Sequence, residues 1–174
     1  MKTITLFISM VLIAFISCQS IVAQPNPSIS KKYSDTEIDK MISAHKGVHS
    51  QDTYPAASLL QQLKNDFPKA KDMDWEVGAN IYEAEFEIGW TDYTAYYDEG
   101  ANLLMYTVEL RESELPAIVK NAAMSKYPNY KFDDIKKIVK GTDTFYKVEM
   151  EKRNSMDIKA TFKPDGAFIK EIKD

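Results

Sequence analysis

Apolar residues from position 55 onward recur first with the period of a helix and then with the period of a strand. Residues 55–68 and 116–128 each space apolar side chains three and four positions apart, between a first-turn proline and a closing aromatic-proline pair. This spacing predicts an amphipathic helix in each segment. Each helix is followed by runs in which apolar and polar residues alternate, which predicts strands. These runs cover 74–77, 81–88, 93–97 and 103–108, and then 135–139, 144–150, 156–163 and 168–172.

The segments 55–110 and 111–174 therefore have the same order of elements and are interpreted as two repeats. Each has an acidic-glycine turn, Glu99-Gly100 or Asp165-Gly166, before its last strand. A helix laid on one face of an antiparallel sheet can bury a single core. We predict an α+β fold: a tandem repeat of one helix packed on a four-stranded antiparallel sheet, with an extra short N-terminal helix.

The duplicated order of elements resembles a known family. It consists of a helix ending in an aromatic-proline pair, a strand with Trp or Ile, a strand with Tyr-x-x-x-Phe or its Met counterpart, and an acidic-glycine turn. Residues 55–174 resemble the PepSY-like family of secreted bacterial proteins. The resemblance implies a fold like that of the tandem β-lactamase inhibitor protein, an envelope location and an inhibitory or binding role. It supplies no catalytic residues.

The first 23 residues have the pattern of a secretory signal peptide. Lys2 precedes the apolar run 4–16, and the small-residue end Ile21-Val22-Ala23 predicts cleavage before Gln24. The run is shorter than the roughly 18 to 20 residues that span a bilayer, so we predict a periplasmic or secreted protein without a membrane span. A loose lipobox ending at Cys18 supports a less favoured alternative, a lipid anchor on that cysteine.

Residues 24–54 are predicted to form a spacer and a short helix. The spacer, 24–32, is expected to be flexible. Ser34 and Glu37 have the spacing of a capping box, which predicts a helix from Asp35 to about Lys46. Two alternatives stay open for this helix: a lid packed on the first repeat, or a semi-ordered tail.

The two repeats differ in charge. Residues 55–110 contain three lysines against eleven Asp or Glu, whereas residues 111–174 contain fourteen Lys or Arg against eleven Asp or Glu. Because the first repeat is acidic, it favours a basic partner and argues against nucleic-acid binding, which needs a basic stripe. Within it, Glu83, Glu85 and Glu87 alternate with apolar residues, so their carboxylates are predicted to project from one sheet face.

Aromatic residues are predicted beside this glutamate row. Alignment of the two acidic-glycine turns places Tyr96 in the core, which leaves Tyr93 and Tyr97 exposed. Trp90 lies in a predicted hairpin, and Met105 lies in a last strand that is apolar on both faces. Aromatic and methionine side chains on an open surface are typical of protein-binding sites.

The sequence therefore favours a non-enzymatic, possible inhibitor-like binding module that holds an envelope protein or a basic peptide on the open face of the first repeat. In a competing interpretation, that face binds no partner protein and is covered by the N-terminal helix, by the second repeat or by the second subunit of a homodimer. The alternative function is a structural or calcium-binding envelope protein that uses the acidic row.

The sequence predicts neither a catalytic site nor a cofactor. It contains one cysteine and no Gly-x-Ser-x-Gly, Walker-type or dinucleotide-binding motif. His45 and His49 have the i, i+4 spacing of a helical metal pair, but Gly47 between them indicates a helix end. Two exposed loop histidines are therefore favoured over a metal site.

Overall fold

The computed structural model describes residues 25–48 and 51–173 of the chain. The predicted signal peptide, Cys18 and His49 lie outside the described residues. The helices are α1 (Asp35–Gly47), α2 (Ala57–Asp66), the 3-10 turn η1 (Glu112–Glu114) and α3 (Ala117–Lys126). The strands are β1 (Gln51–Asp52), β2 (Lys71–Gly78), β3 (Ile81–Ile88), β4 (Thr91–Asp98), β5 (Leu103–Glu109), β6 (Lys131–Lys140), β7 (Asp143–Glu151), β8 (Ile158–Phe162) and β9 (Phe168–Lys173).

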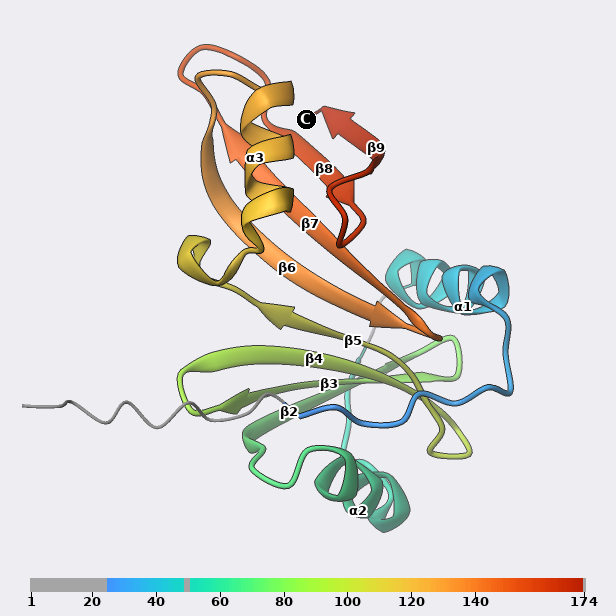
Figure 1. The fold of residues 1–174 in the computed structure, drawn as a ribbon. Coiled ribbons are helices and arrows are strands. Elements are labelled where there is room, and N and C mark those ends of the chain that lie inside the picture. The colour runs from blue at the N-terminus through green and yellow to red at the C-terminus, as the bar shows by residue number, and fades with distance from the viewer. Residues whose placement is uncertain (1–24, 49–50, 174) are drawn as a thin grey trace, which may run out of the picture.

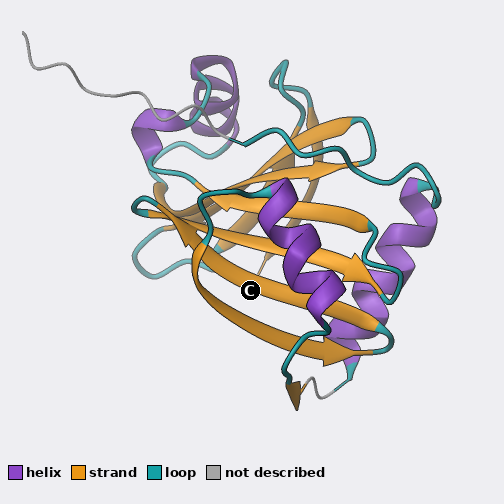
Figure 2. Cartoon of the chain, turned by 90° about the horizontal axis from the view of Figure 1, so that it is seen from below, coloured by secondary structure: helices purple, strands orange, loops and turns teal. Residues whose placement is uncertain are grey.

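The strands of the described residues form one antiparallel sheet of nine strands in chain order. Figure 1 and Figure 2 show the strands running side by side across the molecule. The prediction of a tandem repeat with two four-stranded sheets is therefore wrong. β5 and β6 pair from Met105↔Lys140 to Glu109↔Lys136, which joins the two halves edge to edge. This pairing is favourable because two separate sheets would each leave an edge of unpaired N–H and C=O groups at this point.

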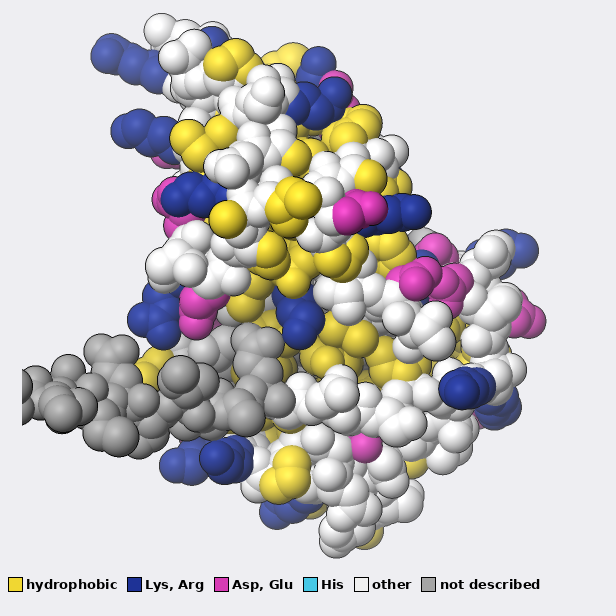
Figure 3. Space-filling view, viewed as in Figure 1, with side chains coloured by type: hydrophobic (Ala, Val, Ile, Leu, Met, Phe, Trp, Pro, Cys, Tyr) yellow, Lys and Arg dark blue, Asp and Glu magenta, His cyan; other side chains and the backbone are white. Residues whose placement is uncertain are grey.

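One face of the sheet, which we call the helical face, carries both α2 and α3. Leu59 and Leu63 of α2 belong to the same buried cluster as Val119 and Ala123 of α3. Figure 1 shows α2 beside the first strands and α3 across the later ones, and Figure 3 shows hydrophobic side chains gathered between them. The helices therefore cover a single continuous core.

The aromatic residue that ends α2 lies in this core. The Phe67 side chain is fully buried, and its ring centroid lies 4.8 Å from that of Phe86 and 5.5 Å from that of Tyr106. Such tilted and edge-to-face contacts favour aromatic pairs beyond the gain from burial alone. The aromatic-proline pair therefore ends the helix and also attaches it to β3 and β5.

The opposite face of the sheet, which we call the open face, is covered in part by α1. Ile38 and Ile42 of α1 pack against Ile81, Leu104 and Met105. The predicted capping box is confirmed, because the Ser34 N–H donates to Glu37 Oε2 at 2.8 Å and the Glu37 N–H donates to Ser34 Oγ at 3.4 Å. The helix packs on the sheet as a lid and is not a semi-ordered tail.

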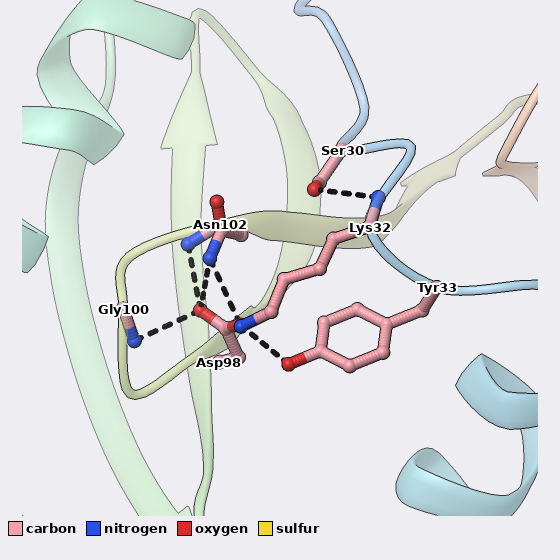
Figure 4. A network of polar contacts seen from close by, with 6 residues as sticks. All are labelled: Ser30, Lys32, Tyr33, Asp98, Gly100 and Asn102. Atoms are coloured by element: carbon pink, nitrogen blue, oxygen red, sulfur yellow. Dashed lines mark hydrogen bonds and ion pairs between the residues drawn. The ribbon is translucent and has the colours of Figure 1, made fainter.

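The segment before α1 is held against the sheet. The Ser30 N–H donates to the Leu103 carbonyl at 2.8 Å, and Lys32 Nζ and Tyr33 OH donate to Asp98 Oδ2 at 3.0 and 2.9 Å (Figure 4). The contacts of Ser30, Lys32 and Tyr33 therefore hold the end of the predicted spacer against the sheet. Asp98 is only 4% exposed, so its carboxylate needs such donors.

Among the described residues, none of the helices has the length and apolar character that a membrane span requires.

Candidate functional site

Carboxylates gather on the open face at the β2–β4 end of the sheet. Glu85 and Glu87 of β3 alternate with the core residues Ala84, Phe86 and Ile88, as predicted for this row. On neighbouring strands, Asp74 lies directly opposite Glu85, and Asp92 directly opposite Glu87. Like charges in directly opposite positions destabilise a sheet. The acidic surface, as we call it, consists of five exposed residues: Asp74, Glu76, Glu85, Glu87 and Asp92.

The electrostatics of this surface favour a cationic partner. Burial raises the pKa of Glu85, and the nearby carboxylates of Glu83, Glu76 and Asp74 raise it further, while Lys136 lowers it. The carboxylates therefore repel one another in the free protein. A positive group bound between them would relieve that repulsion.

The acidic surface is bordered by hollows. One, of about 720 Å³, lies where the short β1 leaves the outer edge of β2 open, and its lining includes Tyr54, Trp75 and Glu85. Another, of about 300 Å³, spans β2 to β6, and its lining includes Glu85, Asp92 and Lys136. Tyr54 is 98% exposed, and the buried Trp75 Nε1 has no hydrogen-bond partner among the described residues. The acidic surface therefore borders concave regions whose lining includes the aromatic side chains of Tyr54 and Trp75.

Glu83, although in the same row, has a structural role. Its Oε2 lies 2.7 Å from His45 Nε2, and its Oε1 accepts a hydrogen bond from Tyr96 OH at 3.0 Å. His45 Nδ1 lies 3.0 Å from the Gly78 carbonyl oxygen. His45 is 2% exposed within α1, so the prediction of an exposed loop histidine is wrong. The pairing of His45 with Glu83 explains why a polar ring is buried there.

Tyr93 and Tyr97 are not exposed. They are 4% and 0% exposed and belong to the core of the helical face. The alignment behind the prediction was displaced by one residue: the left-handed position of the first turn is Ala101 (φ 58°), which corresponds to Gly166 (φ 83°). Tyr97 then corresponds to Phe162, and a displacement of one residue moves every side chain of a strand to the other face.

Trp90 and Met105 differ in exposure. Trp90 is 97% exposed in the turn between β3 and β4, and with Asp92 it lines a hollow of about 190 Å³. Asp92 also lines the hollow between β2 and β6, so Trp90 lies next to the acidic surface. Met105 is 9% exposed and packs with α1. Of the predicted site residues, Glu85, Glu87 and Trp90 therefore remain accessible together.

The basic end of the open face was not predicted from the sequence. Four lysines border a groove there, between α1 and β5–β9: Lys140, Lys147, Lys159 and Lys170. The signal was present in the two-residue spacing of Lys136, Ile138 and Lys140, which places these side chains on one face of a strand. No group of three or more His, Cys, Asp or Glu side chains that would hold a metal ion occurs in the residues that the structure covers.

Comparisons with known proteins bear on the fold. No family model and no curated protein matches the sequence. A DUF2874 family protein from Bacteroides uniformis has a similar structure, with a TM-score of 0.65 and 21% identity over 69% of this chain and 90% of that chain. A protein from Bacteroides eggerthii whose name assigns it to the periplasm gives a TM-score of 0.65 at 20% identity, over 70% and 90%.

A BLIP-like protein from Bacteroides fragilis gives a TM-score of 0.63 at 26% identity, over 70% of this chain and 87% of that chain. These likenesses do not extend to the PepSY-like family, which stays a prediction from the sequence. The chain therefore has the fold of the BLIP-like and DUF2874 family proteins.

Proposed function

We propose that this protein is a non-catalytic binding module of the cell envelope that holds a basic protein or peptide on its acidic surface. The observation that carries the proposal is the set of five exposed carboxylates on one sheet face, with Asp74 opposite Glu85 and Asp92 opposite Glu87. This arrangement costs folding free energy. A bound cationic partner would offset the cost, and the acidic field would speed the encounter.

Trp90 is suited to anchor such a partner. Its indole is 97% exposed beside the acidic surface, and tryptophans of this kind often contribute strongly to binding when a partner covers them. An envelope location is supported by the signal-peptide pattern of residues 1–23. The name of the B. eggerthii protein agrees with this location.

The proposal is tested by capture of partners from an envelope extract on the immobilised chain from residue 24 onward. The test variant is Glu85→Gln, Glu87→Gln, Asp92→Asn. A matched control removes three exposed loop or turn carboxylates away from the acidic surface, in Glu99→Gln, Glu112→Gln, Asp157→Asn. The expected result is a basic protein or peptide retained by the wild type and by the control but not by the test variant.

A purified partner then allows a direct measurement. Its affinity should fall with added salt, and it should shift the fluorescence of Trp90 to shorter wavelength as the indole leaves water. Trp90→Phe separates this signal from that of the buried Trp75. Equal retention by all three forms, or retention of acidic proteins only, would refute the proposal.

A further inference from the structure

The groove at the basic end of the open face is separate from the acidic surface. It has a volume of about 370 Å³, within the range of small-molecule sites, roughly 300 to 1,000 Å³. α1 forms one wall, where Asp39 accepts a hydrogen bond from Lys140 Nζ at 2.7 Å. Figure 1 shows α1 next to the end of the β6–β7 hairpin.

The floor of the groove is apolar. Ile138 and Phe145 are directly opposite each other on β6 and β7, and Ile42 of α1 lies beside them. At the far end, the β9 residues Ile169 and Ile172 are 39% and 54% exposed. An apolar strip that is open to water gains free energy when an apolar ligand covers it.

The second wall is cationic. On the open face Lys147 of β7 lies opposite Lys136 of β6 on one side and opposite Thr161 of β8 on the other, and Thr161 lies opposite Lys170 of β9. The like charges of Lys136 and Lys147 in directly opposite positions oppose folding. Lys147 Nζ forms an ion pair with Glu149 Oε1 at 2.7 Å, which neutralises only part of the positive charge of this wall. A bound anion between Lys147 and Lys170 would supply further negative charge.

The chemistry of the lining distinguishes an aliphatic chain from a peptide. Each residue of a bound peptide brings a backbone donor and an acceptor, and these cost free energy when they lose water without a new partner. Among the described lining residues, the uncharged side chains that hydrogen-bond well are Ser43 and Thr161. An alkyl chain has no such groups to satisfy, so it suits the floor better.

We propose that this groove binds a single-chain fatty acid. The alkyl chain lies along Ile42, Ile138 and Phe145, and the carboxylate lies between the Lys147 and Lys170 ammonium groups. The site uses no residue of the acidic surface, so its test is independent of the test of the proposed function.

Calorimetric titration of the chain from residue 24 onward with dodecanoate, below its micelle concentration, tests this site. We expect one saturable site. In the Lys147→Gln, Lys170→Gln variant the affinity should fall roughly tenfold or more, because two charge-assisted contacts are lost. The matched control, Lys64→Gln, Lys69→Gln, removes two exposed lysines in and after α2 and should bind as the wild type does.

Two further ligands test the two parts of the site. Dodecyltrimethylammonium has the same chain with the opposite charge and should not bind there. Butyrate has the carboxylate without the long chain and should bind much more weakly than dodecanoate. Circular dichroism establishes that both lysine variants are folded before they are titrated.

Several outcomes would overturn the proposal. They are the absence of saturable binding, equal affinity for the ammonium surfactant, and unchanged dodecanoate binding by the Lys147, Lys170 variant. A second copy of the chain as occupant would appear as a dimer in sedimentation that the lysine substitutions dissociate and dodecanoate does not. An acidic, leucine-containing peptide that binds where dodecanoate does not would identify a peptide groove instead.

Discussion

The buried His45 of α1 and the partly buried Glu83 of β3 form a pair that attaches the C-terminal end of α1 to the sheet. His45 Nε2 lies 2.7 Å from Glu83 Oε2, and Nδ1 lies 3.0 Å from the Gly78 carbonyl oxygen. Because a carbonyl oxygen only accepts, Nδ1 must carry the proton of this contact. Tyr96 donates to the other carboxylate oxygen at 3.0 Å. The pair therefore acts with Ile38 and Ile42 to hold α1 on the open face.

The first prediction is that His45→Ala destabilises the protein by about 2 to 3 kcal/mol, because the substitution leaves a half-buried carboxylate without its partner. Chemical unfolding followed by far-ultraviolet circular dichroism measures this change. Lys40→Ala, at an exposed position of the same helix, serves as the control and should change the free energy of unfolding by less than about 0.5 kcal/mol. In a double-mutant cycle, His45→Ala and Glu83→Gln should be clearly non-additive. Additive effects would contradict a coupled pair.

The second prediction concerns the aromatic residues. Tyr97→Ala should cost about 3 to 5 kcal/mol, because it removes a fully buried ring from the core. Trp90→Ala should cost less than about 0.5 kcal/mol, because its side chain is in water. Tyr97→Phe isolates the hydroxyl, which donates to Asp66 Oδ2 at 3.0 Å, and should cost about 1 kcal/mol. Equal costs for Tyr97→Ala and Trp90→Ala would be inconsistent with the burial described above.

The third prediction concerns the dependence of stability on pH. Burial would raise the pKa of Asp98, but hydrogen bonds from the backbone and side chain of Asn102, from Lys32 and from Tyr33 outweigh it and lower the pKa from 3.8 to about 2. A carboxyl whose pKa is lower in the folded state stabilises that state above its unfolded pKa. This contribution is lost as the pH falls from about 4 to about 2.

Asp98→Asn should therefore destabilise the protein at neutral pH by about 2 kcal/mol. The difference in unfolding free energy between the wild type and this variant should shrink as the pH falls through that window. Chemical unfolding at several pH values measures the difference, and comparison with the variant cancels the titration of the other carboxylates. A difference that stays constant down to pH of about 2 would contradict the role of this carboxylate.

The fourth prediction compares the two β-turns that correspond to each other. In Gly166→Ala the new Cβ would meet the Ile118 carbonyl oxygen at 3.1 Å with φ at +83°, so we expect a loss of about 1 to 3 kcal/mol. Ala101 already has a positive φ of 58°. Ala101→Gly should therefore be neutral or stabilise by up to about 1 kcal/mol. Thermal unfolding compares both variants with the wild type, and a destabilising Ala101→Gly would argue against the alignment of these turns.

The sequence predicted those features that depend on residues close together in the chain. Ser34 and Glu37 are three positions apart, and their capping box is present in the structure. The alternation along β3 assigned Glu85 and Glu87 to one face correctly. The exposure of Tyr93 and Tyr97 was wrong, because it depended on aligning two turns in which different residues take the left-handed conformation. A single displaced residue was enough to reverse the faces.

Local sequence by itself therefore determined where α1, α2, α3 and the strands from β2 to β9 form, and which side chains of β3 share a face, because capping and periodicity act over a few residues. Only the tertiary structure decided that β5 and β6 join into one sheet, since which strand edges meet depends on the arrangement of whole elements. It also decided that His45 meets Glu83, and that α1 meets β5–β9 to form the basic groove. These contacts join residues far apart in the chain, and no spacing along the sequence specifies them.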